Sequence, residues 1–147
     1  MAKVLVAVAS VTGTARDIAN DLINANEHLS EVEEPEIISR WCEDEDSILL
    51  LVTSTTGAGD IPIPLNRFHQ LLTTEFPRIA GKRFALIALG DSSYSTFAEA
   101  GNALELALED IGAQVVCPRL TLDATEHFEP NEEAMSWFNQ ELAQYVS

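Results

Sequence analysis

The sequence predicts an α/β fold: a doubly wound parallel sheet in a three-layer sandwich, formed by one domain of residues 1–147. Two observations predict it. Apolar runs of strand length alternate with segments of helical periodicity along the chain, and the main runs are continuously apolar, as in strands covered on both faces. A chain of 147 residues buries a real core yet divides poorly into two domains.

Five segments are expected to form strands, the second of them a short edge strand after Pro35. They are residues 4–9, 36–39, 48–54, 84–89 and 115–122. Four segments with apolar residues at helical spacing are expected to form helices between and after them. They are residues 14–29, 65–72, 97–111 and 132–146, with Gly112 as a C-terminal stop.

The charge of the chain is unusual, because 24 acidic residues against 8 Lys and Arg give a net charge of −16. Such a surface repels nucleic acid and anionic membranes and favours basic protein partners, although acidity for solubility alone explains the number equally well. Residues 1–9 resemble a strand rather than a signal peptide, and the apolar run 48–52 is too short to span a bilayer. Cys42 and Cys117 form neither a disulfide framework nor a metal site, so we expect a cytoplasmic protein with two ordinary thiols.

Three polar, glycine-bearing loops follow the strands that end near Ala9, Thr53 and Leu89. In parallel sheets of this kind, ligands bind beyond the carboxyl ends of the strands, where the winding reverses. We therefore expect the three loops to converge on one site.

The first loop combines the hydroxyls of Ser10, Thr12 and Thr14 with Gly13 at the start of a helix. A helix N-terminus with free amides suits a phosphate, but a plain helix cap has the same composition. The loop is neither a Walker motif nor G-x-G-x-x-G. The second loop, residues 54–60, is either a flexible turn or a backbone that can flip against a ligand. The third, residues 90–94, carries Tyr94, either as a surface side chain or as a platform for a flat heterocycle.

The three loops read "ASVTGTA", "STTGAGDIP" and "ALGDSSYSTF". In this order and separation they resemble those of the flavodoxin family, most closely its short-chain MioC/YqcA-type members. The resemblance extends from the first strand to the last helix. It implies a flavodoxin-like fold, with a five-stranded sheet in the order 2-1-3-4-5 and non-covalently bound FMN.

The resemblance also implies how FMN is held. The first loop wraps the phosphate, the second lies along one side of the isoalloxazine, Tyr94 stacks on the other side, and the backbone of residues 89–91 meets the pyrimidine edge. Gly57 matches the glycine whose peptide can turn its carbonyl toward flavin N5. The cofactor-binding residues implied are Ser10, Val11, Thr12, Gly13, Thr14, Ala15, Ser54, Thr55, Thr56, Gly57, Ala58, Gly59, Leu89, Gly90, Asp91, Tyr94 and Phe97.

The chain departs from common flavodoxins at two places. Thr14 and Ala15 stand where Asn and Thr are usual, and Arg16 either folds back to compensate or is a solvent-exposed helix charge. Thr56 stands where many flavodoxins have a tryptophan, so we expect weaker FMN binding than in tryptophan-bearing relatives.

The function implied is that of an electron-transfer protein that carries single electrons from a reductase to an acceptor enzyme. We find no nucleophile–base pair, metal cluster or G-x-S-x-G motif in the sequence, so no catalytic residues are expected. An FMN-dependent small-molecule reductase and a flavodoxin-like regulatory module that has lost FMN are the alternatives. The resemblance suggests a flavodoxin/ferredoxin–NADP reductase as donor, an unidentified acceptor (biotin synthase being one family-level candidate), and a monomer.

Acidic residues beside the expected cofactor edge are the candidates for partner docking, whereas the acidic run 43–46 lies at the opposite end of the sheet. The candidates are Asp60, Asp91, Glu99, Asp123 and Glu126. Trp41, Trp137 and Cys117 are expected to be packing residues.

Overall fold

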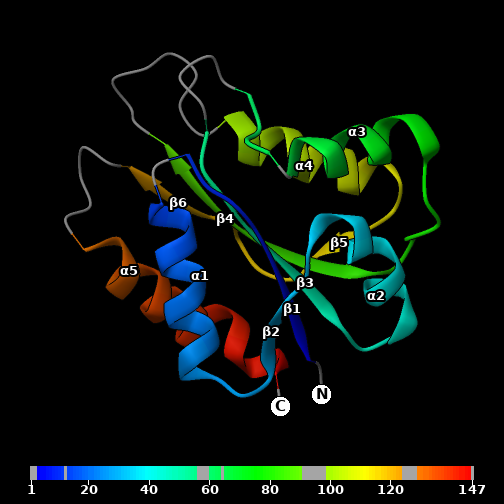
Figure 1. Cartoon of the computed structure of the whole chain (residues 1–147). Coiled ribbons are helices and arrows are strands. Elements are labelled where there is room, and N and C mark those ends of the chain that lie inside the picture. Colours follow the sequence, from blue (N-terminus) through cyan, green and yellow to red (C-terminus); the bar gives the residue numbers. More distant parts are fainter. Residues whose placement is uncertain are drawn as a thin grey trace.

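The computed structural model describes residues 3–11, 13–55, 60–63, 65–90, 99–123 and 129–146. Its centre is a parallel sheet in the order β2-β1-β3-β4-β5, with β6 also paired to β4 (Figure 1). The strands are β1 (Val4–Ala9), β2 (Leu29–Glu31), β3 (Ile48–Thr53), β4 (Arg83–Gly90), β5 (Gln114–Val115) and β6 (Leu120–Asp123). The predicted fold class and strand order are confirmed.

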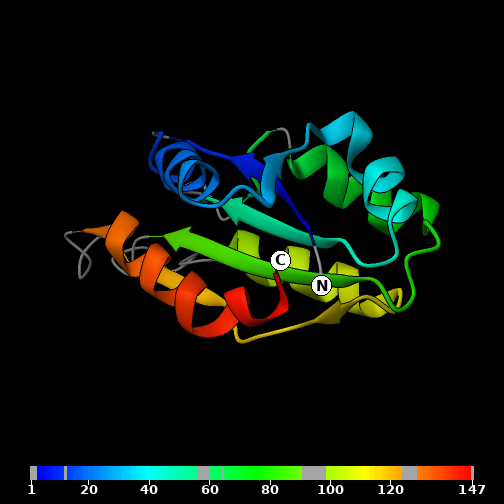
Figure 2. The same ribbon diagram turned by 90° about the horizontal axis from the view of Figure 1, so that it is seen from below.

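Helices cover both faces of the sheet. They are α1 (Thr14–Ala25), α2 (Ile37–Glu43), α3 (Leu65–Glu75), α4 (Glu99–Asp110) and α5 (Pro130–Trp137). A π-helical turn, Phe138–Leu142, and a 3-10 turn, Ala143–Tyr145, extend α5. In Figure 1, α1 and α5 lie on one side of the sheet, and α2, α3 and α4 lie on the other. Figure 2, the view from below, shows the start of β1 close to the end of the C-terminal 3-10 turn, at the edge where the strands begin.

The alternation of side chains along each strand divides the core into two layers. Val4, Val6 and Val8 of β1 pack with α1 and α5, whereas Leu5 and Ala7 pack with the helices of the other face. Both sets are buried. This arrangement explains why the central strands are continuously apolar in the sequence, because each has no solvent-exposed face.

The expected edge strand at residues 36–39 is wrong, because those residues belong to the turn before α2 and to α2 itself. Ile37 and Trp41, four residues apart, lie on the same buried face of this helix. Trp41 is anchored further by its indole Nε1, which donates a hydrogen bond to the carbonyl of Arg83 at 3.1 Å. The true edge strand is Leu29–Glu31, so the first helix ends at Ala25, before residue 29.

The expected last strand, residues 115–122, is divided into β5 and β6. Val115 pairs with Phe84, and Leu120 pairs with Ile87, so five residue steps on this edge face three on β4. Pro118 lies in the bulge, where it needs no ladder hydrogen bond. Its carbonyl accepts a hydrogen bond from Trp137 Nε1 at 3.0 Å, which ties the bulge to α5.

Both tryptophans and Cys117 are buried, as expected. Burial, and secondarily the charge of Glu141, raises the pKa of the Cys117 thiol to about 11, so this thiol stays protonated and unreactive near neutral pH. Among the described residues, no helix is both long and apolar enough to cross a membrane. The same part of the chain contains no group of His, Cys, Asp and Glu that could hold a metal ion.

Candidate cofactor site

The carboxyl ends of β1, β3, β4 and β6 meet at one edge of the sheet. Ala9 pairs with Thr53, Thr53 pairs with Ala88, and Gly90 pairs with Asp123 at the last rung. The winding of the sheet reverses between β1 and β3, because β1 continues toward β2 on one side and β3 toward β4 on the other. This is the position at which open α/β sheets bind ligands.

The first and second loops are joined at their bases. The Ser54 amide donates to the carbonyl of Ala9 at 2.9 Å, and the Val11 amide makes a long contact of 3.5 Å with Ser54 Oγ. The hydroxyl of buried Thr53 donates a hydrogen bond to the carbonyl of Ser54 at 2.9 Å. The structure therefore brings residues 10–11 and 54 together at the switch point.

The start of α1 is shaped by Gly13, which is its N-cap residue and has a left-handed φ of 97°. The Gly13 amide donates to Ser10 Oγ at 2.8 Å, which closes the loop into a tight turn. The first helical hydrogen bond runs from the Asp17 amide to the Gly13 carbonyl at 2.9 Å. The amides of Ala15 and Arg16 come before this first rung of the helical ladder, and first-turn amides are donors for an anion.

Two features of this edge are compatible with a phosphate-bearing ligand, such as the FMN that the resemblance implies. A Cβ at Gly13 would meet no atom within 4 Å, so the turn leaves open space beside its backbone. Thr55 Oγ1 is buried and has no hydrogen-bond partner among the residues that the structure describes. Unpartnered buried hydroxyls are uncommon in native proteins, so this hydroxyl is a candidate donor to a bound ligand.

The other predicted site residues fall into three groups. Leu89 and Gly90 are the last residues of β4, beside β6 at the same edge. Thr14 and Ala15 lie in the first turn of α1, where the Ala15 side chain is fully buried in the core. The remaining predicted residues lie outside the described part of the chain: Thr12, Thr56, Gly57, Ala58, Gly59, Asp91, Tyr94 and Phe97.

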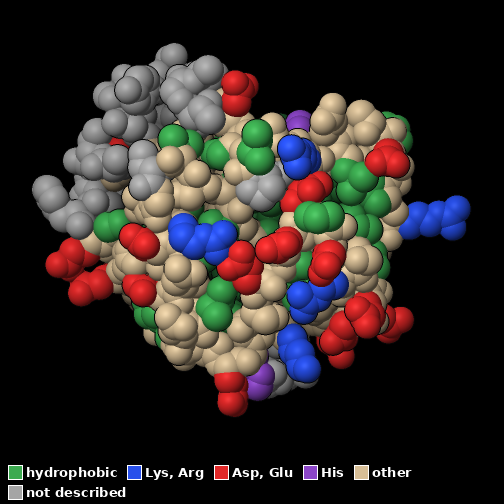
Figure 3. Space-filling view, viewed as in Figure 1, with side chains coloured by type: hydrophobic (Ala, Val, Ile, Leu, Met, Phe, Trp, Pro, Cys, Tyr) green, Lys and Arg blue, Asp and Glu red, His purple; other side chains and the backbone are tan. Residues whose placement is uncertain are grey.

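Asp123 was expected to be a surface residue for docking, and this prediction is wrong. Its side chain is 6% exposed at the end of β6, next to Gly90. The sequence placed Asp123 at the cofactor edge, as its position directly after a predicted strand implies, but its burial could not be read from the sequence. Asp60 and Glu99 are exposed as expected, and Asp91 and Glu126 lie outside the described residues. On the face shown in Figure 3, carboxylates are distributed rather than gathered into one patch.

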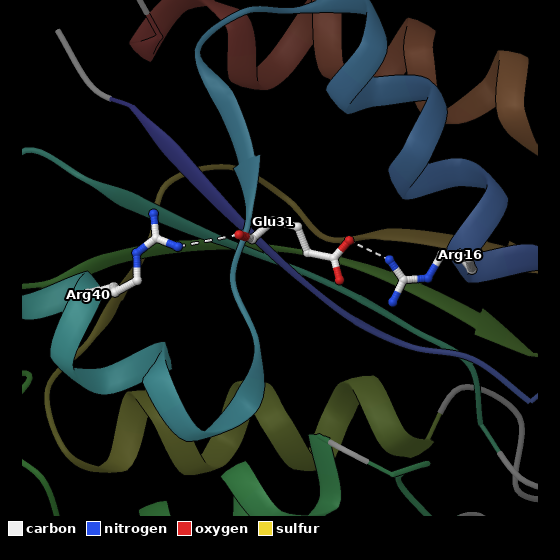
Figure 4. A network of polar contacts seen from close by, with 3 residues as sticks. All are labelled: Arg16, Glu31 and Arg40. Atoms are coloured by element: carbon white, nitrogen blue, oxygen red, sulfur yellow. Dashed lines mark hydrogen bonds and ion pairs between the residues drawn. The ribbon is translucent and has the colours of Figure 1, made fainter.

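The Arg16 side chain neither folds back onto the first loop nor lies free in solvent. It extends from α1 to form an ion pair with Glu31 of β2 (Figure 4). The possibility that Arg16 folds back toward the first loop is therefore not what the structure shows.

Comparisons with known proteins agree with this architecture. The family described as Flavodoxin matches residues 6–138 of the chain. Flavodoxin YqcA of Escherichia coli is 33% identical over 95% of this chain and 96% of its own length. The sulfite reductase [NADPH] flavoprotein alpha-component of Zymomonas mobilis is 34% identical over 86% of this chain, which corresponds to 21% of that protein.

The fold comparison leads to the same group. A solved structure of a cysteine-to-alanine mutant of flavodoxin from Pseudomonas aeruginosa superposes with a TM-score of 0.82, at 30% identity, over 99% of both chains. The family match and the relative aligned over almost the whole chain show that this chain belongs to the flavodoxin family.

Proposed function

We propose that this FMN-binding electron carrier holds its cofactor at the carboxyl edge of β1, β3 and β4, with the three loops that the sequence singles out. Its family makes the protein an electron-transfer flavodoxin rather than an enzyme. The observation that carries the site assignment is the buried hydroxyl of Thr55, which has no partner among the described residues; the turn at Gly13, which leaves open space beside its backbone, supports it.

In this proposal each described residue has a distinct task. Ser10 holds the turn closed through its contact with the Gly13 amide, so that the first-turn amides of α1 are aimed at the phosphate. Ser54 keeps the second loop against the first. Thr55 donates its hydroxyl to a polar atom of the cofactor. FMN supplies the redox chemistry by accepting and releasing electrons singly.

The partners of the protein are redox proteins, and we propose an NADP-dependent flavoprotein reductase of the flavodoxin/ferredoxin type as the donor. The Zymomonas relative, whose matching segment belongs to a protein named an NADPH flavoprotein component, supports this choice. A net charge of −16 favours transient docking to a basic surface, with association that slows as salt increases. We place the protein in the cytoplasm, where free thiols such as Cys42 and Cys117 persist.

The test of the site is a fluorescence titration of the FMN-free protein with FMN and, in parallel, with riboflavin, which lacks the phosphate. If the first loop holds the phosphate, FMN fluorescence is quenched at concentrations at least about tenfold lower than riboflavin fluorescence, because phosphate contacts contribute about 1.4 kcal/mol or more. Equal affinities would show that the first loop is not a phosphate site. No binding of either flavin would contradict the assignment of the site as a whole.

A second expected result concerns Thr55. Replacing it by valine should raise the free energy of unfolding of the FMN-free protein by about 1 kcal/mol, because an unpartnered buried hydroxyl is removed at constant shape. The same change should weaken FMN binding, since the bound cofactor loses a hydrogen bond. Urea denaturation and the fluorescence titration measure the two effects.

The matched control is Thr53→Val, which also removes a buried threonine hydroxyl, but one that donates to the Ser54 carbonyl. This variant should lose about 1 kcal/mol of stability, because the hydroxyl it removes is already hydrogen-bonded. A Thr55→Val protein that is less stable than the parent would show that the hydroxyl is satisfied within the chain.

A further inference from the structure

Arg16 is the cation that follows the first loop most closely in the chain. It occupies the first turn of α1, three residues after Gly13, and α1 contains no other Lys or Arg. A positive charge at this position opposes the helix dipole, and it also lies where it would attract an anion bound to the first-turn amides.

Glu31 holds this cation against the sheet edge. Its carboxylate pairs with the Arg16 guanidinium, and the two side chains are 43% exposed for Arg16 and 36% exposed for Glu31. The main-chain carbonyl of Glu31 accepts a hydrogen bond from Arg40 of α2 at 3.4 Å. Figure 4 shows the two arginines reaching Glu31 from opposite sides, one from each helical layer.

The position of Glu31 makes this pairing a constraint on Arg16. Glu31 is the last residue of β2 and pairs in register with Val6 of β1, so its backbone is part of the sheet ladder. Arg16, in contrast, carries its charge on a long, flexible side chain. The position of the guanidinium is therefore decided by the carboxylate, and a carboxylate in contact cancels most of the field that the cation exerts at a distance.

We propose that Glu31 is a positioning residue that sets the affinity for the cofactor phosphate, because it holds the Arg16 guanidinium at β2 and neutralises its charge. The inference rests on the proposed function, since it requires that the first loop bind the FMN phosphate. It makes the β2 edge, and not only the three loops, a determinant of how tightly the cofactor is held.

The test is the variant Glu31→Gln, which keeps the shape of the side chain and removes its charge. We expect FMN to bind about three- to tenfold more tightly at low salt, because Arg16 is released toward a doubly charged phosphate. Riboflavin binding should not change. The gain should disappear near 1 M salt, where the Debye length falls to about 3 Å.

The control is Glu33→Gln, which removes the same charge from an exposed residue two positions away that takes part in no ion pair among the described residues. It should leave FMN affinity almost unchanged. An equal gain in Glu33→Gln would show that net charge alone matters, and it would overturn the inference.

A double-mutant cycle separates the positioning of Arg16 from a simple charge effect. Arg16→Gln should weaken FMN binding, and Glu31→Gln should produce a smaller gain, or none, in the Arg16→Gln background. Equal gains in both backgrounds would overturn the role of Arg16. If the parent protein prefers FMN to riboflavin but Glu31→Gln binds FMN as the parent does, only this inference fails. If the parent protein binds neither flavin, the proposed function fails and the inference fails with it.

Discussion

Replacing Gly13 by alanine is expected to weaken FMN binding by about 10- to 100-fold and to leave riboflavin binding nearly unchanged. Gly13 has a φ of 97°, a region that residues with a Cβ adopt at a cost of about 1–2 kcal/mol. Alanine would relax the turn that Ser10 closes, so the first turn of α1 would lose the alignment through which we propose that it holds the phosphate. A new Cβ would also occupy the open space beside the loop. The parallel titration with FMN and riboflavin measures the effect.

Gly81→Ala is the matched control for this prediction. Gly81 has a φ of 84°, its Cβ would also meet nothing within 4 Å, and it lies just before β4, at the opposite edge of the sheet. Both variants should lose about 1–2 kcal/mol of stability, since both place a Cβ in the same left-handed region. Only Gly13→Ala should change FMN affinity. If Gly81→Ala weakens FMN binding equally, the effect of Gly13 is one of general stability and not of the phosphate turn.

Replacing Gly112 by alanine should lower the free energy of unfolding by about 3 kcal/mol. Gly112 follows α4, with its amide bonded to the Glu109 carbonyl and the next amide, that of Ala113, bonded to the Leu108 carbonyl, both at 3.0 Å. This is a Schellman motif, whose residue after the helix has a left-handed conformation. Gly112 has a φ of 96°, and a Cβ there would lie 2.9 Å from the Cβ and 3.0 Å from the Cα of Ala80.

The cost of Gly112→Ala has two parts that a second substitution separates. Backbone strain accounts for about 1–2 kcal/mol, and the contact with Ala80 accounts for the rest. In an Ala80→Gly background, where the Cβ contact is removed, the loss should be smaller by about 1 kcal/mol. Urea denaturation of the four proteins of the cycle gives these energies. A loss below about 1 kcal/mol in the single variant would contradict the steric argument.

The central strands and the end of α4 could be predicted from the sequence, because their signals are local. The runs that begin at Val4, Ile48 and Phe84 are buried on both faces, so they are apolar at every position, and their identity as central strands can be predicted without tertiary information. The prediction that Gly112 ends a helix is confirmed by the hydrogen bonds of the Schellman motif there. A residue with a Cβ fits this position poorly, because the φ is left-handed and Ala80 is close. The order of the strands came from the family resemblance and is confirmed.

The edge of the sheet could not be predicted in the same way. The segment Leu29–Glu31 is only three residues long and has one buried side chain, so its local pattern is too weak to distinguish it from a turn. Residues 36–39 contain two adjacent isoleucines, which are typical of strands, but burial of Ile37 and Trp41 on one face favours a helix. The bulge at Pro118 likewise depends on the contact between its carbonyl and Trp137, which lies 19 residues away in the chain.

For the site, the residue types and the order of the three loops can be read from the sequence, because both are local properties. Their convergence at one edge also follows from the sequence, since the carboxyl ends of parallel strands meet there. Which of the described groups are buried or paired with another segment follows from the tertiary structure and not from the local sequence. Asp123 looks like any acidic loop residue in the sequence, yet it is buried beside Gly90. Arg16 looks like a helix charge, yet it pairs with Glu31 from another element. Burial and ion pairing depend on distances between segments far apart in the chain, and those distances exist only once the sheet has formed.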